Sequence, residues 1–110
     1  MKIPNCDQSF VPDQKITDYL LSDTHEIGKG KAKFFKKFGF DVADVGTFKD
    51  ALIRHSVDRD IESEQATGYG AKYILTCEIQ TPDERNPCIV TVWIIETGTE
   101  TPKLITAYPN

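Results

Sequence analysis

The hydrophobic pattern of this chain changes once, close to Gly68, and that change limits the folds it can adopt. Before Gly68, apolar residues recur at intervals of three and four, as on one face of a helix. Beyond it lie three runs rich in β-branched and aromatic residues, at residues 73–80, 88–96 and 103–108. The linkers 81–87 and 97–102 are short enough for hairpins. The pattern predicts an α+β fold in which about three N-terminal helices pack on a C-terminal antiparallel meander of three to four strands.

The helices follow an irregular segment, residues 1–12, and are predicted at residues 12–21, 29–38 and 47–56. Ser22-Asp23-Thr24 offers N-cap oxygens before the second helix, which Gly39 should end as a C′ glycine. Thr47 is expected to be the N-cap of the third helix. Residues 57–67 are polar and acidic and predict a loop, and residues 68–71 predict a turn or a short leading strand.

Length and composition limit the classes of protein to which this chain can belong. A chain of 110 residues is about one domain in length, so a single domain over residues 1–110 is expected. It has no apolar run of membrane-spanning length and no apolar N-terminal signal segment. Three cysteines without paired spacing argue against a disulfide framework or a zinc ribbon and suit a reducing cytoplasm. We therefore expect a cytoplasmic protein with no membrane partner.

The charge is negative overall but unevenly spread. A net charge of −4 and a pI near 5.1 count against nucleic acid as a partner when taken alone. However, residues 29–37 hold five lysines and no acid, whereas residues 58–64 hold four acids and one arginine. A local basic site is therefore compatible with the negative net charge of the chain.

The second predicted helix contains one lysine on its apolar side. At 100° per residue, Phe34, Phe35 and Phe38 share one arc, and Lys31 projects into that arc. The other lysines of the helix, Lys29 among them, fall on the opposite side, as expected of a solvated face. Lys31 either extends its ammonium past the edge of the core or is held at a polar site to meet an anion.

Alternation within the strands predicts a polar sheet face. That face would collect hydroxyl, carboxylate and indole groups from three strands: Thr76, Glu78, Thr91, Trp93, Thr106 and Tyr108. The opposite, buried face would hold Leu75, Cys77, Ile79, Val90, Val92, Ile94, Ile105 and Ala107. The polar face is either an ordinary solvated surface or a surface for a phosphodiester and a stacked base.

The two histidines lie in different surroundings. His25 is in a polar segment before the second helix and is either a surface residue or a general acid or base near neutral pH. His55 lies on the apolar face of the third helix with Phe48, Ala51 and Leu52, so a packed histidine is expected. No segment has metal-ligand spacing, a P-loop or a nucleophile elbow, so any catalysis is expected to need neither metal nor cofactor.

Five segments resemble a family of uncharacterised small bacterial proteins that occur alone or as C-terminal modules of polymorphic toxins. They are KITDYLL at 15–21, HEIGKGKAKFF at 25–35, GF at 39–40, TVWII at 91–95 and TAYP at 106–109. The order of helices and strands is also similar to the barnase–EndoU–colicin–RelE group of metal-independent ribonuclease toxins. Sites in that group combine a histidine or lysine of the helical part with a Thr-x-Tyr on a late strand. By position, this resemblance implicates His25, Lys31, Thr106 and Tyr108.

The resemblance implies cleavage of RNA by attack of the 2′-hydroxyl on its own phosphate. His25 would be the general acid or base, Lys31 would stabilise the phosphorane, and Thr106 would bind a phosphate oxygen. Tyr108 would orient the phosphate or stack a base. Lys29, Thr91 and Trp93 are the remaining expected substrate contacts. Partners would be RNA and a small cognate antitoxin or immunity protein.

The alternative is a non-catalytic binding module. Such an antitoxin or immunity-type protein would offer the acidic segment 58–64 to a basic toxin.

Overall fold

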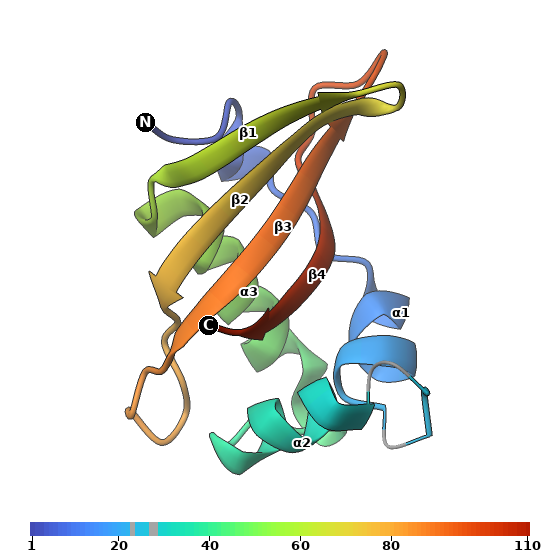
Figure 1. The fold of residues 1–110 in the computed structure, drawn as a ribbon. Coiled ribbons are helices and arrows are strands. Elements are labelled where there is room, and N and C mark those ends of the chain that lie inside the picture. Colours follow the sequence, from blue (N-terminus) through green and yellow to red (C-terminus); the bar gives the residue numbers. More distant parts are fainter. Residues whose placement is uncertain (23, 27–28) are drawn as a thin grey trace.

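The computed structural model describes residues 1–22, 24–26 and 29–110. Four strands form one antiparallel sheet in the order β1-β2-β3-β4. They are β1 (Ile61–Thr67), β2 (Gly70–Glu78), β3 (Cys88–Glu96) and β4 (Lys103–Pro109). The helices are α1 (Asp13–Lys15), α2 (Lys29–Lys37) and α3 (Val45–Asp58). α3 crosses one face of the sheet, α1 lies beside β4, and α2 lies near the C-terminal end of β4 (Figure 1). The predicted fold class, helices followed by an antiparallel meander, is confirmed.

The longest helix, α3, supplies much of the core. Phe48, Leu52 and His55 are buried on its inner face, as expected from their spacing. Its N-cap is Asp44, whose carboxylate accepts the backbone N–H of Thr47 at 3.3 Å. The prediction of Thr47 as the cap is therefore wrong, because Asp44 three residues earlier provides the stronger acceptor. The helix also extends two residues beyond the predicted end.

The first predicted helix is divided into two parts. α1 continues into a turn of π-helix, Ile16–Leu20, in which the backbone N–H of Leu21 bonds to the carbonyl of Ile16. The wider turn buries Ile16 and Leu20 completely. Tyr19, between them, packs its ring against the edge of the core.

The second helix ends at Lys37, one residue before the predicted end, and is followed by the predicted glycine. Gly39 follows α2 with a φ of 104°, the left-handed conformation that a C′ glycine adopts readily. Ala32 and Phe35 face the core from α2. The segment before α2 has Ser22 Oγ accepting the backbone N–H groups of Thr24 and His25. Asp23 of the predicted cap, Ile27 and Gly28 lie outside the described residues.

Residues 57–67 do not form the predicted loop. Val57 and Asp58 end α3, and residues 61–67 form β1 at one edge of the sheet. β1 was missed because its side chains between Ile61 and Thr67 are all exposed, so it has no apolar alternation. β1 forms through backbone pairing with β2. The two glutamates of β1 place charge on an open edge of the sheet, which discourages pairing with another chain.

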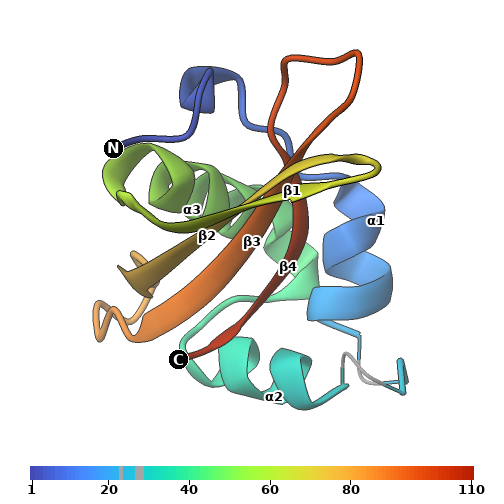
Figure 2. The same cartoon turned by 45° about the horizontal axis from the view of Figure 1, so that its top comes forward.

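The predicted assignment of sheet faces is wrong in the middle of the sheet. Thr91 and Trp93 are fully buried on the face covered by α3, whereas Val92 and Ile94, which alternate with them along β3, are only half-buried. Cys77, expected inside, is exposed and has a φ of 102°, which interrupts the alternation of β2. Figure 2 shows the sheet with α3 on one side only. Alternation by itself does not say which of the two alternating sets of side chains faces the core. The polarity of Thr91 predicts a solvated face for its set, and that prediction is wrong.

A closed hydrogen-bond network explains why Thr91 lies in the core. Trp93 Nε1 donates to Thr91 Oγ1 at 2.9 Å, and Thr91 Oγ1 lies 2.9 Å from His55 Nδ1. His55 Nε2 lies 3.0 Å from the carbonyl oxygen of Cys77, which can only accept. The Thr91 hydroxyl therefore donates to Nδ1 of a neutral His55. Burial, ahead of the nearby Arg59, lowers the pKa of His55 against the opposing effects of the Cys77 carbonyl and Asp58.

Among the described residues, no helix is long and apolar enough to cross a membrane.

Candidate functional site

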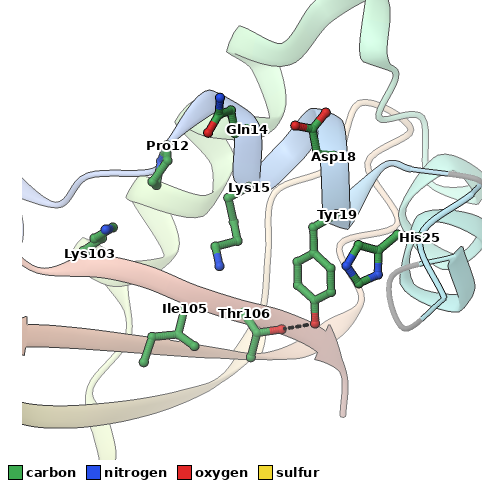
Figure 3. Close-up of a pocket in the computed structure, with 9 residues that line it drawn as sticks. All are labelled: Pro12, Gln14, Lys15, Asp18, Tyr19, His25, Lys103, Ile105 and Thr106. Carbon is green, nitrogen blue, oxygen red and sulfur yellow. Dashed lines mark hydrogen bonds between the residues drawn. The ribbon is translucent and has the colours of Figure 1, made fainter. Parts of the chain in front are cut away.

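Tyr19 is at the centre of a polar cluster between the helices and β4. The π-helical turn places the Tyr19 ring beside the sheet, with its hydroxyl 3.1 Å from Thr106 Oγ1 (Figure 3). The same hydroxyl accepts a short hydrogen bond from the ammonium of Lys31. Three segments far apart in sequence, the π-turn, α2 and β4, therefore meet at one phenol oxygen.

Lys31 completes the cluster from α2. Besides the bond to Tyr19, its Nζ donates to Thr106 Oγ1 at 3.2 Å. It also lies 4.7 Å from the centroid of the Tyr19 ring and 5.8 Å from that of Tyr108. An ammonium has three donors, and two are directed at Tyr19 and Thr106, so one can donate to a bound anion. The Lys31 side chain extends past the apolar arc of α2, and its ammonium group ends in this polar cluster.

A β-bulge places Thr106 and Tyr108 correctly for these contacts. The pairing of β3 with β4 shifts between Val92 and Trp93, so that Thr106 pairs with Val92 and Tyr108 with Val90. The shift occurs on an outer strand of the sheet, where a bulge can redirect a side chain. Tyr108 is 36% exposed, so its ring is available to solvent.

His25 approaches the cluster from the other side of Tyr19. Its ring packs edge-on against the Tyr19 ring with the centroids 4.9 Å apart. Tyr19 therefore lies between His25 and the strand (Figure 3). Around this phenol the structure brings together all four of the residues that the sequence implicated in chemistry, His25, Lys31, Thr106 and Tyr108.

The cluster changes the acidity of Tyr19. Burial alone would raise the pKa of its phenol, but the hydrogen bond from Lys31 and the hydrogen bond shared with Thr106 outweigh that effect. The positive charges of Lys31 and Lys15 act in the same direction, and Lys15 Nζ lies 5.5 Å from the ring centroid. The pKa of Tyr19 is therefore lowered, which makes the phenol a better proton donor than an ordinary tyrosine.

An open pocket of about 770 Å³ adjoins the cluster (Figure 3). Its lining comes from the first helical segment, from His25 and from β4: Pro12, Gln14, Lys15, Asp18, Tyr19, His25, Lys103, Ile105 and Thr106. Two lysines and a histidine face one carboxylate in this lining, and Lys31 lies behind Tyr19 and Thr106. The arrangement suits an anionic ligand and provides both hydroxyl and ammonium donors.

Two of the three predicted substrate-binding residues lie elsewhere. Thr91 and Trp93 are fully buried in the core, so neither side chain reaches a ligand in this structure. Lys29 is exposed at the start of α2, and only its backbone N–H, bonded to the carbonyl of His25, links it to the cluster.

Tyr19 is the residue that sequence reasoning missed as a site member. It falls at helical spacing with Ile16 and Leu20 and therefore appeared to be a core residue. Its hydroxyl was the available signal, since a buried Tyr needs a hydrogen-bond partner and Lys31 needs an acceptor.

The described residues contain no group of three or more His, Cys, Asp or Glu side chains placed to hold a metal ion.

Comparison with known proteins gives a family and a similar fold among solved structures. The family model described as "Domain of unknown function (DUF6883)" matches residues 2–110. Among solved structures, the fold is similar to a chain of the "Contact-dependent growth inhibition toxin - immunity protein complex from Klebsiella pneumoniae 342". The TM-score is 0.73 at 18% identity, over 96% of this chain and 96% of that chain. No curated protein matches.

Proposed function

The chain belongs to the DUF6883 family, and we propose that it is a toxin-type endoribonuclease that cleaves RNA without a metal ion. The observation that carries the proposal is the hydrogen-bonded cluster of Lys31, Tyr19 and Thr106 beside an open, locally positive pocket. The fold relative from a toxin–immunity complex supports a toxin-related setting.

The reaction we propose is transesterification. The 2′-hydroxyl loses its proton to a base, its oxygen bonds to the adjacent phosphorus, and the bond from phosphorus to the 5′-oxygen breaks. The leaving 5′-oxygen takes a proton from an acid, and the products carry a 2′,3′-cyclic phosphate and a 5′-hydroxyl. Each proton transfer by a positioned side chain is worth about 10²–10⁴-fold in rate.

The roles follow from position in the cluster. Lys31 and Thr106 donate to the phosphate oxygens, where negative charge grows in the transition state. Tyr19 lies beside this position and His25 lies against the Tyr19 ring, and the two form the acid–base pair, with the acidified phenol of Tyr19 as the proton donor and His25 as the base. Tyr108, partly exposed beside Lys31, orients the phosphate or stacks a base.

Expression in bacterial cells tests the proposal. The wild-type chain should arrest growth and fragment cellular RNA, whereas His25→Ala, Lys31→Met and Tyr108→Phe should be less harmful. Lys33→Met is the matched control, since Lys33 is exposed on the same helix and lines no part of the pocket. Harmless wild-type expression with intact tRNA, rRNA and mRNA would contradict the proposal.

A structural role for Lys31 must be separated from a catalytic one. Lys31 ties α2 to β4 through Thr106, so its loss could simply destabilise the fold. Urea unfolding of purified Lys31→Met should show a loss of about 1–3 kcal/mol, the net value expected for part-buried hydrogen bonds from a charged donor. A fully folded but inactive variant would assign Lys31 to the chemistry.

The acidic strand β1 favours a second candidate, the immunity-type binding module. Glu62 and Glu64 are exposed there, although Asp58 is paired with Arg54 and Asp60 with Lys2 and the N-terminus. A module of this kind would be harmless when expressed alone and would bind a basic toxin in a fixed ratio. The same expression experiment therefore discriminates between the two candidates.

A further inference from the structure

Two lysines, Lys15 and Lys103, line one groove between the first helical segment and β4, and Lys31 lies at the polar cluster beside it. Lys15 extends from the helix towards the strand beside Tyr19 (Figure 3). Lys103 lies further along, at the start of β4, and lines the same pocket as Lys15. The three ammonium groups come from three different elements, so no single helix face accounts for them.

The groove is positive in a chain that is negative overall. Asp18 is the one acid in the described pocket lining, and Glu96 lies 4.0 Å from Lys103 at the limit of an ion pair. Asp13, close by in sequence, is paired with Lys49 on α3 and therefore does not neutralise Lys15. Ile105 and Pro12 add apolar wall to the same pocket, so it offers surface to bases as well as charge to phosphates.

The groove continues along β4 beyond the Lys31–Thr106 end. Lys103 pairs with Ile94 and Thr106 with Val92, two residues apart on β3, which is about 7 Å along a strand rising roughly 3.3 Å per residue. A dinucleoside monophosphate has one phosphate and would occupy only the Lys31–Thr106 end. Only a longer strand would reach Lys15 and Lys103 as well.

We infer, on the basis of the proposed ribonuclease function, that Lys15 and Lys103 form a subsite for phosphates that flank the scissile one. The substrate is therefore an extended RNA strand with more than one phosphate held along the groove. Lys15 and Lys103 contact phosphates next to the scissile one.

Binding tests the subsite without requiring cleavage. The probe is a 2′-O-methyl pentanucleotide, which cannot undergo attack by a 2′-hydroxyl. Lys15→Ala and Lys103→Ala should each weaken its binding about 5- to 10-fold at 50 mM salt, while Lys33→Ala should leave it within twofold. Equal affinity in all four proteins, or binding no tighter than that of a 2′-O-methyl dinucleotide, would overturn the subsite.

Cleavage by the same proteins separates this inference from the proposed function. The wild-type kcat/KM for an RNA pentanucleotide should exceed that for a dinucleoside monophosphate at least tenfold, and Lys103→Ala should reduce that ratio. If both substrates are cleaved equally well, the subsite is wrong and the ribonuclease stands. If the uncleavable probe binds through Lys15 and Lys103 but RNA stays intact, the subsite stands and the ribonuclease is wrong.

Discussion

Tyr19 connects the sequence of this chain to its candidate chemistry at the scale of a single residue. Its ring packs at the edge of the core, while its hydroxyl accepts from Lys31 and shares a hydrogen bond with Thr106. One side chain therefore both packs against the core and makes hydrogen bonds, as is common for tyrosine at the border of a core. Lys31 has its ammonium satisfied there without leaving the apolar side of α2.

Replacing Tyr19 by Phe should remove the hydroxyl that donates the proton and keep the packing of the ring. RNA cleavage should fall about 10²-fold, the loss typical when one preorganised donor is deleted. The free energy of unfolding should fall by about 1 kcal/mol, for the lost hydrogen bonds. Tyr69→Phe is the control, since Tyr69 is 81% exposed in the turn between β1 and β2. If Tyr19→Phe cleaves RNA as fast as the wild type, the phenol has no role in proton transfer.

His55 should make the stability of the fold depend on pH. Its pKa is lowered in the folded state, so the unfolded chain binds the proton first as the pH falls. The free energy of unfolding is therefore highest above about pH 6.5, the ordinary histidine value, and decreases below it by at most about 1.4 kcal/mol per pH unit. Urea titrations between pH 8 and 5.5 measure this slope.

A substitution tests whether the slope comes from His55. His55→Gln should flatten it. A slope that persists unchanged in His55→Gln would assign the pH dependence to another group.

At the scale of elements, what the sequence predicts depends on how much of an element faces the core. α2 was predictable from the arc that its phenylalanines share, and β3 and β4 from their runs of β-branched and aromatic residues. β1 was not, since its stability comes from backbone pairing and its side chains face solvent. The wrong assignment of the buried face of β3 has another cause. Thr91 is buried, and His55 and Trp93 satisfy its hydrogen bonds. No local pattern reveals such a partner 36 residues away.

The same distinction applies to the site. Lys31 could be singled out by its place among phenylalanines, and Thr106 and Tyr108 by the family resemblance. That they meet at Tyr19 depends on the π-turn and on the bulge in β4, neither of which has a sequence signature here.

The hairpin that joins β1 to β2 depends on one glycine. Gly70 has a φ of 149°, and a Cβ there would lie 2.2 Å from the carbonyl oxygen of Ile95 on β3. Gly70→Ala should therefore destabilise the fold by about 1–3 kcal/mol, through backbone strain and displacement of β3. Gly68→Ala is the matched control, because a Cβ at Gly68 meets nothing within 4 Å. Equal urea midpoints for the two variants would contradict this account of the turn.

At the scale of the whole molecule, charge separation reconciles an acidic chain with the proposed anionic substrate. The net charge is −4, yet Lys15 and Lys103 line one groove with Lys31 at the cluster beside it, while the acids Glu62 and Glu64 lie on β1 at the opposite edge of the sheet. Local potential determines where a ligand binds, and net charge mainly affects solubility and long-range encounter.

RNA binding should accordingly show a modest salt dependence. With about three lysines on phosphates, the slope of log K against log salt should be about −2, from roughly −0.7 for each contact with a single strand. Lys103→Ala should make that slope shallower by about 0.7, and fluorescence anisotropy between 50 and 200 mM salt measures both. A slope near zero would mean that phosphates are not held in the groove.

The most direct test of a metal-independent ribonuclease is the chemistry of the cut ends. Purified protein, in buffer containing a chelator, should convert an RNA oligonucleotide into fragments ending in a 2′,3′-cyclic phosphate and beginning with a 5′-hydroxyl. Mass spectrometry identifies these ends, and a single 2′-deoxy substitution at the cleaved position should abolish that cut. Intact RNA at stoichiometric protein, or cleavage that persists at the 2′-deoxy position, would contradict the account.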